Sequence, residues 1–357
     1  MGDFFGETLY VYAVVPFIKI IAAIVVVLTI IAYTTFAERK ILGFLQVRMG
    51  PNRVGPWGLL QPIADVAKLL GKEDVIPNRA VKWAYVLAPC LVVGPALLIL
   101  SVIPFGPPSS KGVASSWFIT DVNVGLLLVV AIASIGVYGL LLGGWASNNK
   151  FSMMGGLRAA AQMISYEVPQ GFSLVVPLLM AGTLSLVGIV EAQLTQGRWF
   201  IFGFFPFGLL AFFIYFVAGV AESNRNPFDL PEAESELVAG FHTEYSGMRF
   251  ALFFLGEYAN MIVISAVAVT MFLGGWLRPF PSVEWLSFLD LAFLPAGLAG
   301  LLWFLIKLLV FLFVYIWFRG TFPRYRFDQL MDLGWKWLIP ASVLAVVATS
   351  LWKVVLL

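Results

Sequence analysis

The long apolar runs of this sequence constrain its fold more than any other feature. Of its residues, 61% are hydrophobic and only 12% are charged, against roughly 25% charged in soluble domains. An apolar run of about 18 residues or more is long enough to cross a bilayer as a helix. None of the runs alternates as a barrel strand would. We therefore predict an all-α polytopic membrane protein that forms a single integral membrane domain over residues 1–357. The eight spans are expected at about 11–33, 80–103, 122–142, 160–184, 200–221, 250–273, 292–317 and 335–356.

The basic residues between these spans predict the orientation of the chain. Alternate connections, at 34–79, 143–159, 222–249 and 318–334, hold fourteen Lys and Arg residues. The opposite loops hold only Lys111, Arg198 and Arg278, with Lys353 near the C-terminus. Because basic residues remain on the inner side of a membrane, we expect these four connections to lie inside and both termini on the outer, periplasmic side. The acidic N-terminus also argues against a cleaved signal peptide.

The composition excludes several chemistries for this chain alone. One cysteine, Cys90, and one histidine, His242, cannot together form a zinc site, an iron–sulfur cluster or a bis-histidine haem. A net charge of +2 gives no reason to expect nucleic acid as a partner. We therefore expect no metal and no redox centre here, so that any electron carriers belong to other chains.

The first inner connection contains an amphipathic segment at 58–70. Its residues Leu59, Ile63, Val66 and Leu70 recur at helical spacing, while Asp65 and Lys68 lie off that stripe. This pattern predicts a helix lying along the membrane surface or against a partner. An ordinary surface helix, beneath basic residues attracted to anionic lipids, is an equally good interpretation from this segment alone.

The connection after the fifth span is dense in carboxylates. Its residues 222–248 hold one Lys or Arg residue, Arg225, and six acids: Glu222, Asp229, Glu232, Glu234, Glu236 and Glu244. The simpler interpretation is a helix start in water, with Asp229 as its cap and Glu232 in the first turn. That interpretation does not explain the density of charge. Crowded or buried carboxylates favour their protonated forms, so we expect groups that exchange protons near neutral pH.

Three acids interrupt apolar spans. Glu167 lies in the fourth predicted span, Glu257 in the sixth, and Glu222 closes the fifth. A charge at the centre of a membrane costs at least about 2.5 kcal/mol, so such residues usually face a bundle interior and lie on proton or ion routes. Pairing with Lys19 and Lys307, the two lysines within spans, is the alternative explanation. We favour a buried chain of titratable groups.

Several motifs resemble one known family along the whole chain. They are Glu38-Arg39-Lys40, Gln46-Val47-Arg48-Met49-Gly50-Pro51-Asn52, the segment 58–65, Ile164-Ser165-Tyr166-Glu167, the acidic stretch 222–245, and the closing loop 324–331. In this order they resemble the quinone-binding membrane subunit of respiratory complex I, called the H subunit or subunit 8. The resemblance implies a quinone chamber where this subunit meets the hydrophilic arm, with FMN and iron–sulfur clusters held by partner subunits.

The resemblance also implies roles for particular residues. Quinone, the substrate, is expected near Glu38, Arg39, Arg48, Asp65 and Phe228. A proton relay is expected through Glu167, Glu222, Asp229, Glu232, Glu234, Glu236 and Glu257. No residue of this chain is expected to perform the reduction itself. We expect it instead to couple quinone reduction to proton translocation, as a subunit of NADH:quinone oxidoreductase.

The resemblance further implies the surroundings of the chain. Expected partners are the quinone-site and terminal iron–sulfur subunits of the hydrophilic arm, the small and antiporter-like membrane subunits, and membrane lipids. We expect a bacterial inner membrane rather than a mitochondrial one. Two alternatives remain open at this stage: the related membrane subunit of an energy-converting hydrogenase, and an ion-coupled secondary transporter.

Overall fold

The computed structural model describes residues 13–109, 116–231, 234–282 and 294–356, and within these ranges the chain forms helices and no strands. The longer helices are α2 (Val15–Leu45), α3 (Gln61–Gly71), α4 (Lys82–Ile99), α5 (Gly125–Ala146), α6 (Lys150–Ala181), α7 (Leu186–Thr195), α8 (Phe207–Glu222), α10 (Gly247–Phe272), α11 (Ala296–Thr321) and α13 (Ile339–Leu356). Two short helices, α9 (Glu234–Leu237) and α12 (Phe327–Asp332), lie in connections. This arrangement confirms the all-α fold class.

Seven helices in the described part of the chain are long and apolar enough to cross a membrane. The span predicted at 200–221 is the exception. It is divided into a 3-10 turn at Phe200–Phe202 and the 16-residue helix α8, which starts directly after Pro206. Because proline has no backbone N–H to donate, it favours the first turn of a helix over its interior. Seven of the eight predicted spans therefore correspond to a helix long and apolar enough to cross a membrane.

Several helices continue beyond the predicted spans. Helix α2 runs to Leu45, through the charged residues that were assigned to the first connection. Helices α5 and α6 are joined by residues 147–149 alone, where the side chain of Asn149 accepts a hydrogen bond from the backbone N–H of Phe151. Charged residues such as Glu and Lys form helices readily. Hydropathy therefore predicts where the chain leaves the hydrocarbon region of the membrane, but a helix can continue beyond that point.

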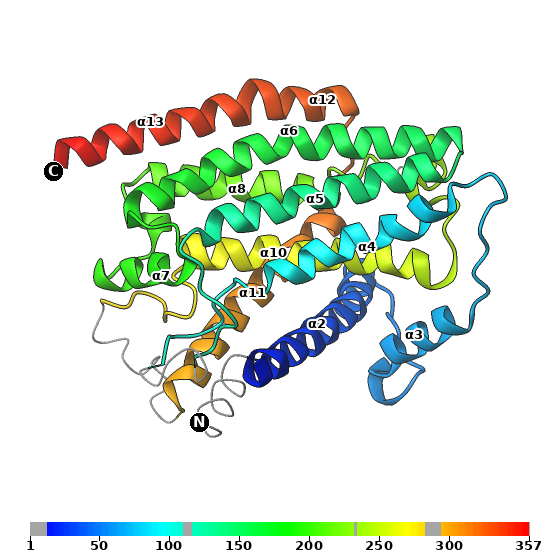
Figure 1. Ribbon diagram of the computed structural model, residues 1–357, viewed down its shortest axis with the longest axis horizontal. Coiled ribbons are helices and arrows are strands. Elements are labelled where there is room, and N and C mark those ends of the chain that lie inside the picture. The colour runs from blue at the N-terminus through cyan, green and yellow to red at the C-terminus, as the bar shows by residue number, and fades with distance from the viewer. Residues whose placement is uncertain (1–12, 110–115, 232–233, 283–293, 357) are drawn as a thin grey trace, which may run out of the picture.

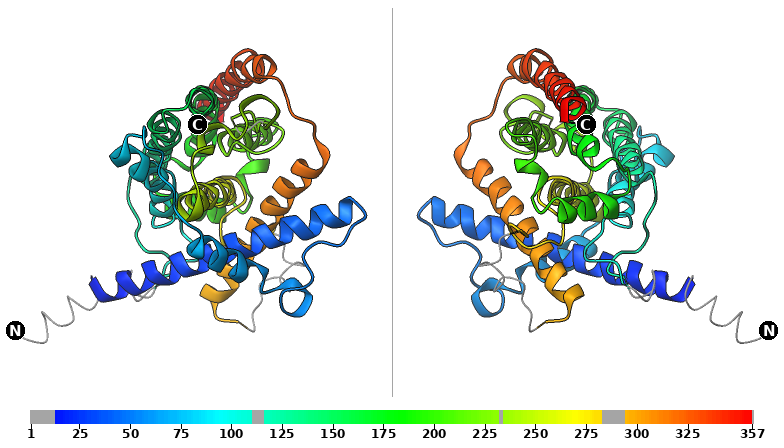
Figure 2. Two further views of the ribbon diagram at one scale, coloured as in Figure 1. Left: turned by 90° about the vertical axis from the view of Figure 1, so that its right-hand side faces the viewer. Right: turned by 90° about the vertical axis from the view of Figure 1, so that its left-hand side faces the viewer.

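Two helices are distinguished by their burial. In the most apolar part of α10, 72% of residues are buried, against 11% in α2. Figure 1 shows α10 running among α4, α5, α6 and α8, whereas α2 and α11 cross this group obliquely. Figure 2 shows α2 extending past the edge of the bundle. The bundle is therefore organised around α10, with α2 on its periphery.

Candidate functional site

A buried amide of α6 binds the start of the connection that follows α8. The Nε2 atom of Gln162 donates to the carbonyl oxygens of Ala221 at 2.7 Å and Phe228 at 2.9 Å. Gln162 and Asn224 are both buried, and their side chains lie 3.2 Å apart. These bonds satisfy backbone groups that would otherwise be unpaired in the core. The start of the acidic connection is therefore folded into the bundle rather than exposed to water.

Arg225 lies at the centre of a buried charged cluster. Its side chain is 5% exposed, with Nε 2.5 Å from a carboxylate oxygen of Glu257 and Nη1 3.3 Å from Glu38. The guanidinium carbon lies 4.2 Å from the ring centre of Tyr258. Burial alone would lower the pKa of Arg225, but Glu257 and the other nearby groups raise it above its ordinary value. Arg225 therefore remains a cation and neutralises the acids beside it.

Glu38 connects this cluster to α11 and to a large polar cavity. Its carboxylate also accepts a hydrogen bond from the hydroxyl of Tyr258 at 2.8 Å and pairs with Arg319 of α11. The cavity has a volume of about 520 Å³ and is lined in part by Glu38, Arg39, Arg48, Tyr258 and Arg319. Arg39 also pairs with Asp65 of α3 at 2.7 Å. Four of the five residues expected near the quinone thus lie in or beside one cavity.

The fifth of these residues, Phe228, lies elsewhere. Its ring is 4% exposed, is stacked on Tyr325 with ring centres 5.6 Å apart, and does not line the polar cavity. Its neighbour Asp229 pairs with Arg324 at 3.0 Å. Burial raises the pKa of Asp229, and Arg324 offsets this effect only in part. Together these contacts join the acidic connection to the closing loop.

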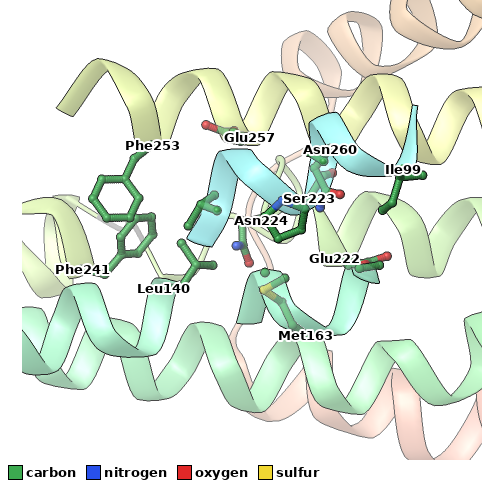
Figure 3. Close-up of a pocket in the computed structure, with 16 residues that line it drawn as sticks. Ile99, Leu140, Met163, Glu222, Ser223, Asn224, Phe241, Phe253, Glu257 and Asn260 are labelled. Atoms are coloured by element: carbon green, nitrogen blue, oxygen red, sulfur yellow. The ribbon is translucent and has the colours of Figure 1, made fainter. Parts of the chain in front are cut away.

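Two small, mainly apolar cavities, each with a few polar residues in its wall, continue from the charged cluster into the bundle. The first, of about 40 Å³, is lined by residues that include Glu222, Glu257 and Asn260. Figure 3 shows Phe241 and Phe253 at one end of this pocket and Glu222 and Asn260 at the other. Each cavity exceeds the roughly 10–15 Å³ that one water molecule requires. The second, of about 30 Å³, shares Ala133, Glu222 and Asn260 with the first and reaches Glu167.

The carboxylates of these cavities have few partners. Glu222 is 6% exposed, and its Oε2 atom has no hydrogen-bond partner among the described residues. Glu167 accepts a hydrogen bond from the hydroxyl of Ser134. Buried polar atoms are normally satisfied, if not by protein then by ordered water. Glu257 and Glu222 therefore share the first cavity, and Glu222 and Glu167 share the second, so each pair of carboxylates has space for water between its members.

Two of the remaining predicted relay residues, Asp229 and Glu236, line neither of these cavities. Glu236 pairs with Arg158 at 2.6 Å, and its side chain is 54% exposed. Only the backbone of Glu234 is described, in α9, and Glu232 lies outside the described residues. The interpretation of Asp229 as a helix cap is wrong, because its side chain faces Arg324 and the next described helix begins at Glu234.

The two lysines within spans do not provide the countercharge for this cluster. Lys307 donates to the backbone carbonyl oxygens of Leu273, Gly275 and Leu277 at 2.6–2.8 Å. Lys19 donates to the carbonyl oxygens of Ser116 and Phe118. The buried base beside these acids is Arg225, which the sequence presents only as a single base in an acidic stretch. Tyr258, Arg319 and Asn260 also belong to the site and carry no distinctive sequence signal.

The site and the fold define a polytopic helical membrane protein with a buried ionic cluster. A profile of the NADH dehydrogenase family matches residues 18–350. One similar protein is the second of two NADH-quinone oxidoreductase H subunits of Koribacter versatilis, which is 49% identical over 95% of this chain and 97% of its own length. Another is the NADH-quinone oxidoreductase H subunit of Paraburkholderia phymatum, which is 50% identical over 94% of this chain and 90% of its own length. The first of the two Koribacter versatilis H subunits is 48% identical over 88% and 86%. The chain belongs to this family, that of the H subunit of respiratory complex I.

Proposed function

We propose that this chain is the H subunit, a membrane component, of a proton-translocating NADH:quinone oxidoreductase and forms the membrane side of its quinone chamber. In this proposal the polar cavity at Glu38 receives the quinone, and Arg225 transmits the change in charge to the buried carboxylates. Quinone reduction takes up protons, so it alters the electrostatic demand on groups beside the chamber. Glu257, Glu222 and Glu167 then exchange protons along the bundle.

The observation that carries this proposal is the position of Arg225 between two kinds of cavity. One of its partners, Glu38, lines the polar cavity of about 520 Å³. The other, Glu257, lines the small cavity that also contains Glu222. A change of charge at Glu38 alters how strongly Arg225 is held by Glu257, because the three groups form one buried ionic network. A continuous path of ionic contacts therefore leads from the polar cavity to the interior of the bundle.

The surroundings follow from the same proposal. The basic connections lie on the inner side with both termini on the outer side, and the membrane is a bacterial plasma membrane. The partners are the subunits of the complex that carry FMN and iron–sulfur clusters, together with neighbouring membrane subunits. The similarity to proteins named as H subunits of NADH-quinone oxidoreductase favours this function over the hydrogenase and transporter alternatives.

The test replaces the buried acids one at a time in the assembled complex. Glu222→Gln and Glu167→Gln keep the size of each side chain and remove its titration. We expect intact assembly with quinone-linked turnover and proton pumping reduced together by about tenfold or more. NADH oxidation by a water-soluble artificial acceptor should be unchanged, since it does not use the membrane subunit.

The matched control is Glu236→Gln, because Glu236 is in the same acidic connection but is half-exposed and pairs with Arg158. It should retain nearly full turnover. Wild-type turnover and an unchanged proton-to-electron ratio in both Glu222→Gln and Glu167→Gln would remove these residues from the route.

A further inference from the structure

An apolar cavity that the proposed function does not use lies between α2, α10 and α11. Its volume is about 510 Å³, and it lies toward the end of α2 that is opposite to Glu38. Two of its wall residues, Ala266 and Phe304, are fully buried, whereas Val26 on its open side is 51% exposed. The cavity is therefore a cleft with buried walls that opens sideways from the bundle. This volume is within the roughly 300–1,000 Å³ typical of ligand pockets.

One end of the cavity is marked by polar and amphipathic side chains. Lys19 and Trp117 line it there, and the lysine donates to the carbonyl oxygens of Ser116 at 2.8 Å and Phe118 at 3.1 Å. The indole of Trp117 packs so closely on Gly297 of α11 that no Cβ atom would fit at that position. Lysine and tryptophan are typical of the level where hydrocarbon meets the head groups. This end therefore marks the membrane surface.

The length of the cavity corresponds to one leaflet. It extends along α2 from Lys19 to Ile30, which at about 1.5 Å per residue is roughly 16 Å. Half of a hydrocarbon core of about 30 Å is roughly 15 Å. Dividing the volume by this length gives a mean cross-section of roughly 30 Å². The apolar walls and the leaflet-long shape fit a thin, extended, apolar chain.

We propose that this cavity binds an acyl chain of a membrane phospholipid in the leaflet opposite to the basic connections, with the head group at the level of Lys19 and Trp117. The apolar walls remove the chain from contact with other lipids and hold it as part of the subunit. An isoprenoid quinone tail is also thin and apolar, but under the proposed function its ring is reduced near Glu38, so its polar end would lie far from Lys19. The head-group level at Lys19 therefore favours a phospholipid.

The test uses the whole complex in bilayer discs that contain phosphatidylethanolamine with a diazirine at the end of one acyl chain. After illumination, mass spectrometry should find labelled peptides from the walls, at Ile262, Ala266 or Leu305. The variant Ala23→Trp fills the cavity and should reduce this labelling severalfold. The matched control Val25→Trp places the same side chain on the exposed side of α2, outside the cavity, and should leave the labelling unchanged.

Three results would overturn the proposal. The first is labelling confined to exposed positions of α2, and the second is labelling of the walls that Ala23→Trp does not reduce. The third is displacement of the lipid label by a long-tailed quinone at concentrations that saturate turnover. If Ala23→Trp fails to assemble, Ala22→Trp, which fills the same cavity from the neighbouring position, takes its place.

Discussion

Two buried cations, Arg225 and Lys307, are stabilised in different ways. Arg225 lies against the carboxylates of Glu257 and Glu38. Lys307, which is 7% exposed, donates to three backbone carbonyl oxygens that follow the end of α10. Both arrangements satisfy a charge that would otherwise be very costly in an apolar bundle. They differ because the carboxylate partners of Arg225 can change their charge, whereas the carbonyl partners of Lys307 cannot.

This difference separates a responsive region of the molecule from a fixed one. Carboxylates gain and lose protons, so the interaction energy around Arg225 depends on the state of its neighbours. Backbone carbonyl groups do not titrate, so the surroundings of Lys307 are constant. We infer that the half of the bundle around Arg225 serves coupling, and that the half around Lys307 fixes where α10 ends. Substitutions at the two positions should have distinct consequences.

Arg225→Gln is expected to have the largest effect. It removes the cation nearest to Glu257, and leaving a buried charge without its partner typically costs about 3–5 kcal/mol. We expect little assembled complex, measured by native gel electrophoresis and by the yield of the purified enzyme. The double variant Arg225→Gln with Glu257→Gln should recover assembly without recovering quinone-linked turnover.

Arg225→Lys is the control for charge, since it keeps the cation but not the planar guanidinium. It should assemble better than Arg225→Gln. Normal assembly of Arg225→Gln with full turnover would show that the ionic cluster is not required for coupling.

Ala133→Leu should have an intermediate effect, confined to the responsive region. Ala133 is one of the residues shared by the two small cavities, together with Glu222 and Asn260. A leucine there occupies space that water would need between the carboxylates. We expect assembled complex with severalfold lower turnover and pumping. Ala131→Leu, on the exposed side of the same helix and in neither cavity, is the matched control, and equal loss of turnover in the two variants would argue against a specific route.

Lys307→Met should have the smallest effect on activity. It leaves the carbonyl oxygens at the end of α10 without their donor, which typically costs about 1–3 kcal/mol. We expect a lower midpoint of thermal inactivation, while turnover per assembled complex and the proton-to-electron ratio stay at wild-type values. Lys336→Met, at an exposed residue, should alter neither. A changed proton-to-electron ratio in Lys307→Met would make Lys307 part of the responsive region.

The sequence predicts the positions of the spans and of the buried acids because both depend on local hydropathy. An apolar run interrupted by Glu167 or Glu257 has few ways to fold other than as a helix with the acid facing the bundle interior. The amphipathic pattern around Ile63 likewise predicts α3, which the structure has at Gln61–Gly71. These features can be predicted without knowing which distant segments of the chain contact one another.

The contacts of Arg225 could not be predicted in the same way. Arg225 is separated from Glu38 by 187 positions in the chain, and only the packing of α2, α8 and α10 brings the two together. Hydropathy also placed the end of the first span at residue 33, although α2 continues to Leu45 and carries Glu38 into the cluster. Ion pairs between distant segments depend on tertiary structure, which composition and periodicity do not specify.

The most direct test of coupling is infrared difference spectroscopy of the complex as bound quinone is reduced. A carboxyl group that gains or loses a proton changes its C=O stretching band, which a glutamine cannot reproduce. We predict a carboxyl band in the wild-type difference spectrum that is absent in Glu222→Gln and present in Glu236→Gln. Identical carboxyl bands in the wild type and in Glu222→Gln, Glu257→Gln and Glu167→Gln would contradict a relay through these residues.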